Sequence, residues 1–295
     1  MEDYDFRRVS PTALVPAFAR GEYTKIPWAK EILSVLRSRG ATLSDGPWSE
    51  QSARGYAPFF EARFRAVSQV LAEKTASQVL ELAAGLSPRG MELTQRGVVY
   101  VESDLPEAMT MKREIVTAVL GAVPPNLHLC TASVIDQDQL LVCCLPFVVG
   151  QPVAVTTEGL LRYLTFEEKT KVAANVLDIL ERYGGWWITT DIHLKSFLQR
   201  QSQTHRQSEQ DTLRRSLDSN YFADLDHAHQ FFESCGFAVN ARPLLEGIRG
   251  QLTAPLDDDK VGQFLNDHPL FVLTPARMRP AGVARVSPPP KGSTK

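Results

Sequence analysis

The chain has 295 residues, of which 43% are hydrophobic, enough for one large α/β domain with additions or for two small domains. Its formal net charge of −2 offers no overall attraction to phosphate backbones or anionic lipids, which excludes nucleic acid as an expected main partner. The acidic start MEDYDFRRVS lacks the apolar core of a signal peptide, and no run of about 18 apolar residues follows it, so we expect a cytoplasmic protein without a membrane partner.

Residues 1–75 are predicted to form a helical cap. Their pattern is amphipathic, and aromatic residues punctuate it. These aromatic residues are Tyr23, Trp28, Trp48, Tyr56, Phe59 and Phe60. The hydrophobic pattern changes after this segment, and we predict that an α/β domain covers residues 76–276.

Short apolar runs alternate with helical patterns throughout that second part. Such an alternation is typical of a mostly parallel sheet covered by helices on both faces. The sequence therefore predicts an α/β fold with a doubly wound sheet. The predicted strands lie at 78–84, 97–103, 126–132, 152–159, 186–192, 236–243 and 270–276.

One of the separating helices has clear boundaries. Thr165 can cap its amino end, Glu168 completes a capping box, and Gly184 supplies the stop. The apolar face between them consists of Val172, Ala173, Val176, Leu177, Leu180 and Tyr183. The run LLVCCLPFVV at 140–149 fits either a buried strand or a helical turn.

Two segments differ in composition from the rest. Residues 195–220 are rich in Gln, Arg and Ser, which is typical of an exposed helix, a mobile insertion or a lid over a site. Residues 277–295 are basic and rich in proline, and we predict that they form a flexible tail.

The four cysteines show no CxxC spacing. Cys143 and Cys144 are adjacent within an apolar run, as buried reduced thiols are. We therefore predict reduced cysteines rather than a metal or redox site.

A glycine turn follows the first predicted strand in the stretch LELAAGLSPRG. Gly85 can take a positive φ or let a ligand approach closely. Asp104 lies 19 residues later at the end of the next strand, where it can accept hydrogen bonds from both hydroxyls of a ribose. Pro88 stands where a dinucleotide loop has its third glycine, which degrades a pyrophosphate cradle. S-adenosylmethionine therefore fits better than NAD.

Four blocks of the sequence carry a resemblance to a known family. They are EARFRAVSQVL at 61–71, VLELAAGLSPRG at 79–90, VYVESDLPEAMTMKR at 99–113 and VAVTTEGLLRYL at 153–164. In these blocks the chain resembles the leucine carboxyl methyltransferase family, which includes bacterial polyketide-type O-methyltransferases. The resemblance implies a class I methyltransferase, Rossmann-like, with a seven-stranded sheet, a helical cap and a lid insertion, and S-adenosylmethionine as the cofactor.

The resemblance also implies which residues bind the cofactor. Arg63 corresponds to an arginine that holds the methionine carboxylate with its planar fork. Asp104 binds the ribose diol, with Glu102 as the alternative on the same strand face. Glu158 lies near the methionine amino group and the sulfonium, where a carboxylate is favourable. The first-strand block adds Glu81, Ala83 and Gly85.

The adenine contact departs from the family pattern. The family has an aspartate after the third strand, and this chain has Ser133 at that point. Serine can accept a hydrogen bond, and Asp136 is the alternative if the register slips.

The chemistry implied is an in-line displacement, in which an acceptor oxygen attacks the methyl carbon. A carboxylate acceptor needs no base, whereas a hydroxyl acceptor benefits from one. Asp191 and His193 follow the fifth strand and are the candidate catalytic residues. The histidines show no spacing that predicts a metal site.

The predicted function is therefore O-methylation of a carboxyl or hydroxyl group, with a small molecule as acceptor and a protein C-terminus as the alternative. Two other classes stay open. They are an NAD-type oxidoreductase and a cofactor-binding protein without catalysis, the second suggested by Ala83 and Ser133.

Overall fold

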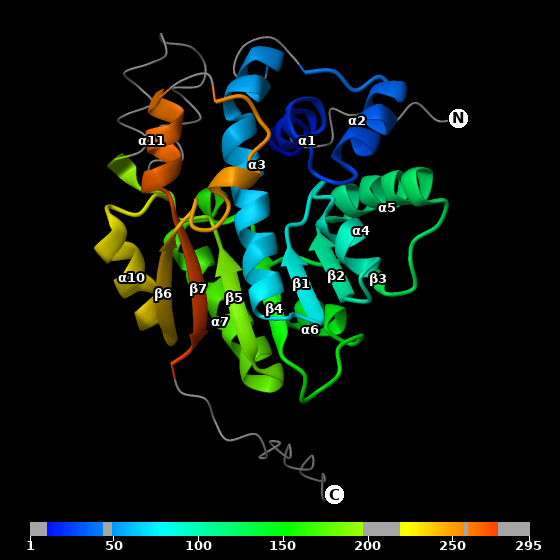
Figure 1. Cartoon of the computed structure of the whole chain (residues 1–295). Coiled ribbons are helices and arrows are strands. Elements are labelled where there is room, and N and C mark those ends of the chain that lie inside the picture. The colour runs from blue at the N-terminus through cyan, green and yellow to red at the C-terminus, as the bar shows by residue number, and fades with distance from the viewer. Residues whose placement is uncertain (1–10, 44–48, 197–218, 257–258, 277–295) are drawn as a thin grey trace, which may run out of the picture.

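The computed structural model describes residues 11–43, 49–196, 219–256 and 259–276 (Figure 1). Three helices come first: α1 (Pro11–Tyr23), α2 (Ala29–Ser38) and α3 (Glu50–Glu73). The candidate lid at 195–220 lies outside the described residues except at its two ends. The whole tail at 277–295 lies outside them.

Strands and helices then alternate as the sequence predicts. The strands are β1 (Gln78–Leu82), β2 (Val99–Asp104), β3 (Leu127–Thr131), β4 (Val153–Thr157), β5 (Gly185–Thr189), β6 (Phe237–Pro243) and β7 (Pro269–Pro275). The helices are α4 (Arg89–Thr94), α5 (Pro106–Leu120), α6 (Gln137–Cys143), α7 (Phe166–Tyr183), α10 (Leu225–Ser234) and α11 (Asp259–Asp267), with short 3₁₀ turns at Leu161–Tyr163 and Arg249–Gln251.

All seven strands join one sheet in the order β3-β2-β1-β4-β5-β7-β6. The first five pair in parallel, and β7 runs antiparallel between β5 and β6. Strands β2 and β3 are added on one side of β1 and the later strands on the other, which places the ends of β1 and β4 at the switch point of the sheet. Ligands of open α/β sheets bind at this position.

Both faces of the sheet are buried, because successive side chains of each strand point in opposite directions. Val79 packs into a hydrophobic cluster with side chains of α1 to α5, and its neighbour Leu80 packs into a second cluster with α6, α7 and α10. Both side chains are fully buried. The cap helices thus share a core with the sheet, and a domain boundary at residue 75 stays a prediction.

Two local predictions can be compared with the structure directly. The helix between Thr165 and Gly184 is confirmed, including the reciprocal bonds of the capping box. The run at 140–149 is helical at its start, within α6, and continues as turns.

The prediction of reduced thiols is wrong for two cysteines. Cys130 at the end of β3 and Cys143 at the end of α6 form a disulfide, with Cα atoms 5.7 Å apart. The loop between them folds α6 back against β3, a contact that the sequence spacing does not reveal. Cys144 is a buried free thiol and Cys235 a half-buried one.

No helix among the described residues is long and apolar enough to cross a bilayer.

Candidate active site

The turn after β1 takes a left-handed path at two positions. Ala83 has φ of 52° and Gly85 has φ of 50°. A Cβ atom added at Gly85 would meet nothing within 4 Å, so space lies open beside this residue. The N–H of Ala84 donates to the carbonyl of Ser103 at 3.1 Å and ties the turn to β2. Backbone conformation, rather than crowding, is what favours glycine here.

Asp104 ends β2 directly beside this turn. Its carboxylate accepts hydrogen bonds from the N–H groups of Gly85 and Leu105, each at 2.8 Å. Burial raises the pKa of Asp104, and these two backbone donors act against the rise. Each oxygen keeps a lone pair, so the carboxylate can still accept two hydroxyl groups.

Glu102, the alternative for the ribose, faces the interior. Its side chain is fully buried, and its Oε2 lies 2.9 Å from the ammonium of Lys112. Burial raises the pKa of Glu102, whereas Lys112 lowers it. The geometry therefore favours Asp104 as the residue that a ribose can reach.

Gly90 makes room for Glu102. A Cβ atom at Gly90 would lie 2.4 Å from Oε1 of Glu102 and 3.0 Å from the ring of Tyr100. We expect Gly90→Ala to lower the free energy of unfolding by about 1–3 kcal/mol, because α4 must move away from the sheet. Urea denaturation measures this change. Gly55→Ala is the control, because Gly55 lies in α3 with nothing within 4 Å of the added atom, and it should be neutral or stabilising. Equal behaviour of the two variants would contradict the steric argument.

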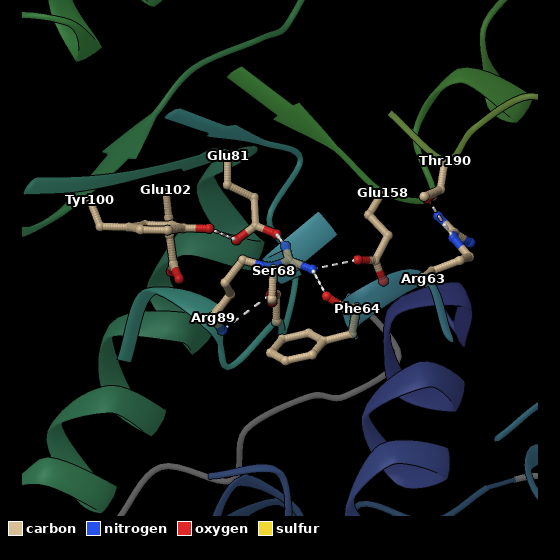
Figure 2. Close-up of polar contacts among 12 residues, drawn as sticks. Arg63, Phe64, Ser68, Glu81, Arg89, Tyr100, Glu102, Glu158 and Thr190 are labelled. Atoms are coloured by element: carbon tan, nitrogen blue, oxygen red, sulfur yellow. Dashed lines mark hydrogen bonds and ion pairs between the residues drawn. The ribbon is translucent and has the colours of Figure 1, made fainter. Parts of the chain in front are cut away.

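Arg89, the first residue of α4, lies at the centre of a buried cluster of charges (Figure 2). It donates to Glu158 at 2.8 Å and to Glu81, and Glu81 also accepts the hydroxyl of Tyr100 at 2.8 Å. Burial opposes its charge, but the two carboxylates outweigh burial and raise the pKa of Arg89. Sequence analysis missed this residue. Its place directly after the glycine turn was the only signal.

Glu158 follows β4, as predicted, and its side chain is almost buried. Burial alone would raise the pKa of Glu158, but the nearby arginines, with Arg89 first, hold it below its usual value. The residue is therefore an anion at neutral pH, which suits the neighbourhood of a cation.

Arg20 of α1 joins the same cluster from the cap. Its side chain is buried, and Nη1 lies 3.5 Å from Oε1 of Glu158. Its Nε has no hydrogen-bond partner among the described residues. A buried guanidinium with an unused donor fits an anionic ligand group. Nothing in the sequence pointed to Arg20, which precedes the sheet by more than 50 residues.

Arg63 reaches the site from α3. It donates to the hydroxyl of Thr190 at 3.0 Å and to Oδ1 of Asp191 at 2.8 Å, and its Nη2 lies 3.6 Å from a Cβ built at Gly159. Its guanidinium thus lies between the loops that follow β4 and β5.

Asp191 is saturated with donors. Oδ1 accepts from Arg63 and from the N–H of Gly159, and Oδ2 accepts from the N–H groups of Leu160 and Leu161. A carboxylate offers about four acceptor positions, and these four bonds occupy them. The geometry therefore favours a structural role for Asp191 over the predicted role of proton acceptor.

His193 is buried, and its Nε2 has no hydrogen-bond partner among the described residues. Burial first, and then the charge of Arg162, hold the pKa of His193 well below its usual value. The imidazole is therefore neutral at pH 7. Its ring lies 5.5 Å from that of Tyr221.

The two adenine candidates lie in the loop between β3 and α6. The N–H of Ser133 donates to Gln139 at 2.8 Å, and Asp136 caps α6 through the N–H of Gln139 at 3.0 Å. The disulfide closes this loop. Which of the two contacts adenine stays a prediction.

Two cations that form no ion pair with a described side chain lie beyond β4. The guanidinium of Arg162 lies 5.4 Å from the ring centre of Tyr163 and 5.8 Å from that of Tyr221. Lys169 is buried and donates to the carbonyls of Leu164 and Asn220. Burial lowers the pKa of Lys169 to about 8. Neither residue forms an ion pair with a described side chain, whereas the arginines nearer β1 do.

Comparison with known proteins decides the family. Residues 26–177, just over half of the chain, match the family model described as leucine carboxyl methyltransferase. The chain belongs to the leucine carboxyl methyltransferase family. Members of this family use S-adenosylmethionine, so the chain is an S-adenosylmethionine-dependent methyltransferase of class I. This excludes the NAD-type oxidoreductase. No curated protein matches the chain by sequence.

Solved structures of low identity resemble the chain. Magnesium protoporphyrin IX methyltransferase (ChlM) from Synechocystis PCC 6803, with bound SAH, is 11% identical and covers 83% of this chain and 91% of its own, at a TM-score of 0.49. A putative O-methyltransferase from Nostoc punctiforme is 14% identical. The match covers 90% of this chain and 71% of that protein, at a TM-score of 0.45. The mitomycin 7-O-methyltransferase MmcR is 11% identical. The match covers 91% of this chain and 74% of that protein, at a TM-score of 0.43. The assignment depends on the family model and not on these likenesses.

The residues at the switch point fit the family's cofactor. The open space beside Gly85, the free lone pairs of Asp104 and the unused donor of Arg20 match the needs of a nucleoside with a charged amino-acid group.

Proposed function

We propose that this methyltransferase transfers a methyl group to an oxygen of a carboxylate-bearing acceptor. The observation that carries the proposal is the pair of cations, Arg162 and Lys169, neither of which forms an ion pair with a described side chain. The charges of both act on His193, which follows β5. An anion would compensate their charge there.

In this proposal, the residues at the switch point bind different parts of S-adenosylmethionine. Asp104 binds the ribose diol. Arg63 and Arg20 bind the carboxylate of the methionine moiety. Glu158 faces the amino group and the sulfonium. Glu81 acts through Arg89, which it holds in place, and Ser133 or Asp136 binds adenine.

A carboxylate acceptor makes few demands on the protein. Bound S-adenosylmethionine supplies an electrophilic methyl group. A carboxylate is already ionised at neutral pH, so no side chain has to remove a proton. The chain's own residues hold the acceptor oxygen in line with the methyl group and neutralise the acceptor's charge.

A hydroxyl acceptor is the second candidate, and one observation favours it. His193 is neutral, with Nε2 unpartnered among the described residues, and could take a proton from a hydroxyl group. Because its pKa is strongly lowered, a rate that depended on His193 would also be flat from pH 6 to 8. A pH profile in this range cannot separate the two candidates, and variants are needed.

The test compares carboxylic acids with the alcohols of the same carbon skeletons in a methyl-transfer assay. We expect turnover of an acid to a methyl ester, identified by the methanol that alkali releases from it. Arg162→Met should raise the KM of the acceptor about tenfold or more while the affinity for S-adenosylmethionine stays unchanged. His193→Gln should retain most of kcat. A product stable to alkali, with a loss of roughly 10²-fold or more in His193→Gln, would establish the hydroxyl acceptor instead.

A further inference from the structure

A buried lysine lies underneath the glycine turn. Lys112 of α5 is fully buried, and so is its partner Glu102, with Nζ 2.9 Å from Oε2. Lysine is almost never fully buried unless it is paired. The ammonium and the carboxylate therefore compensate each other's charge.

The same ammonium also bonds to the turn. Nζ donates to the carbonyl of Ser87 and lies 3.5 Å from the carbonyl of Gly85. An ammonium group has three donors, and these two carbonyls take two of them, while Glu102 lies at ion-pair distance. The turn is thus held on both sides, since Asp104 accepts the N–H of Gly85 while Lys112 binds its carbonyl.

This arrangement matters because the turn has an unfavourable conformation. Ala83 is an alanine in the left-handed region, an unfavourable conformation that persists only when surrounding contacts fix it. Ala84 and Ser87 contribute backbone bonds to the turn, but the carbonyls of Gly85 and Ser87 depend on Lys112. Without the cation, the turn could relax toward the open space beside Gly85.

We propose that Lys112 is a positioning residue for S-adenosylmethionine, which fixes the turn at 85–87 and, through Gly85, the ribose acid Asp104. Lys112 does not touch the cofactor itself. Its effect on affinity is transmitted through the backbone of the turn and the Gly85–Asp104 hydrogen bond.

The test separates this role from a contribution to the fold. Lys112→Met alone leaves Glu102 buried without a partner and destabilises the chain. The double variant Lys112→Met with Glu102→Gln removes both charges and replaces them by side chains of similar size. Glu102→Gln alone is the matched control for binding, because it keeps the ammonium on the turn carbonyls. It leaves that ammonium without its carboxylate, so its melting temperature should fall as well. The readouts are the melting temperature, the Kd for S-adenosylmethionine by calorimetry, and hydrogen exchange of peptides that cover 83–88.

The double variant should melt close to the wild type yet bind S-adenosylmethionine about tenfold more weakly or worse, with faster exchange at 83–88. Glu102→Gln should bind like the wild type. A double variant that recovers stability and affinity together would overturn the proposal, and so would an equal loss of affinity in both variants. No acceptor is present in this experiment, so its outcome is independent of the proposed carboxylate acceptor.

Discussion

Asp191→Ala is expected to lower the free energy of unfolding by about 3–5 kcal/mol, the usual cost of removing one partner of a buried ion pair. The change leaves the guanidinium of Arg63 without its carboxylate and leaves three backbone N–H groups, at residues 159–161, without an acceptor. Chemical denaturation with a structural probe measures the loss. The loop after β4 should become more accessible to protease at the same time.

Asp191→Asn is the informative partner of that variant. An asparagine keeps one acceptor oxygen, so it should destabilise the chain less than alanine, yet clearly. If Asp191 were the proton acceptor, Asp191→Asn would instead keep the wild-type stability and lose turnover. That result would restore the catalytic role which the geometry disfavours.

The second large effect concerns the cofactor. Asp104→Ala should weaken S-adenosylmethionine binding by at least tenfold, because two charge-assisted hydrogen bonds to the ribose are worth on the order of 2–4 kcal/mol. Calorimetry with S-adenosylmethionine and with adenosine measures the change. Both ligands carry the ribose, so both should lose affinity by similar factors.

Arg63→Lys provides the contrast to this variant. A lysine cannot reproduce the planar fork, so the affinity for S-adenosylmethionine should fall. The affinity for adenosine, which lacks the carboxylate, should stay almost unchanged. If Asp104→Ala bound both ligands like the wild type while Glu102→Gln did not, the ribose acid would be Glu102. The correspondence with the family's ribose-binding acid would then shift by two residues along β2.

The elements of the fold could be predicted because their signals are local. Apolar runs of strand length gave all seven strands, and Thr165 with Glu168 marked the start of α7, since a capping box needs only four consecutive residues. The order of the strands and the antiparallel β7 are long-range properties, which local signals do not show.

The site could be predicted in part for the same reason. Gly85 and Asp104 stand at strand ends, which can be recognised from the sequence. Arg20 could not be found, because its contact with Glu158 spans 138 residues and depends on how α1 packs. The disulfide was missed in the same way, since no spacing rule brings β3 against α6.

The geometry disfavours the predicted role of Asp191 for a different physical reason. Its position after β5 predicts an acid that faces the cleft at the carboxyl ends of the strands, and the acid does lie at that edge. Its hydrogen-bond donors come from the backbone that follows β4, which the parallel β4–β5 pairing brings alongside. A sequence shows side chains that could accept bonds, but it does not show which backbone N–H groups will be left over nearby.

The charges of the cap helices restrict how this architecture can be recombined. Arg20 and Arg63 belong to α1 and α3, whereas Glu158 and Asp191, which they meet, follow β4 and β5. A chimera that joined the first 75 residues of one relative to the sheet of another would bury unmatched charges unless both arginines and both acids came along. A cap should therefore be exchanged between family members only together with the acids that its arginines meet. Arg20 and Asp191 fall outside the stretch that the family model matches.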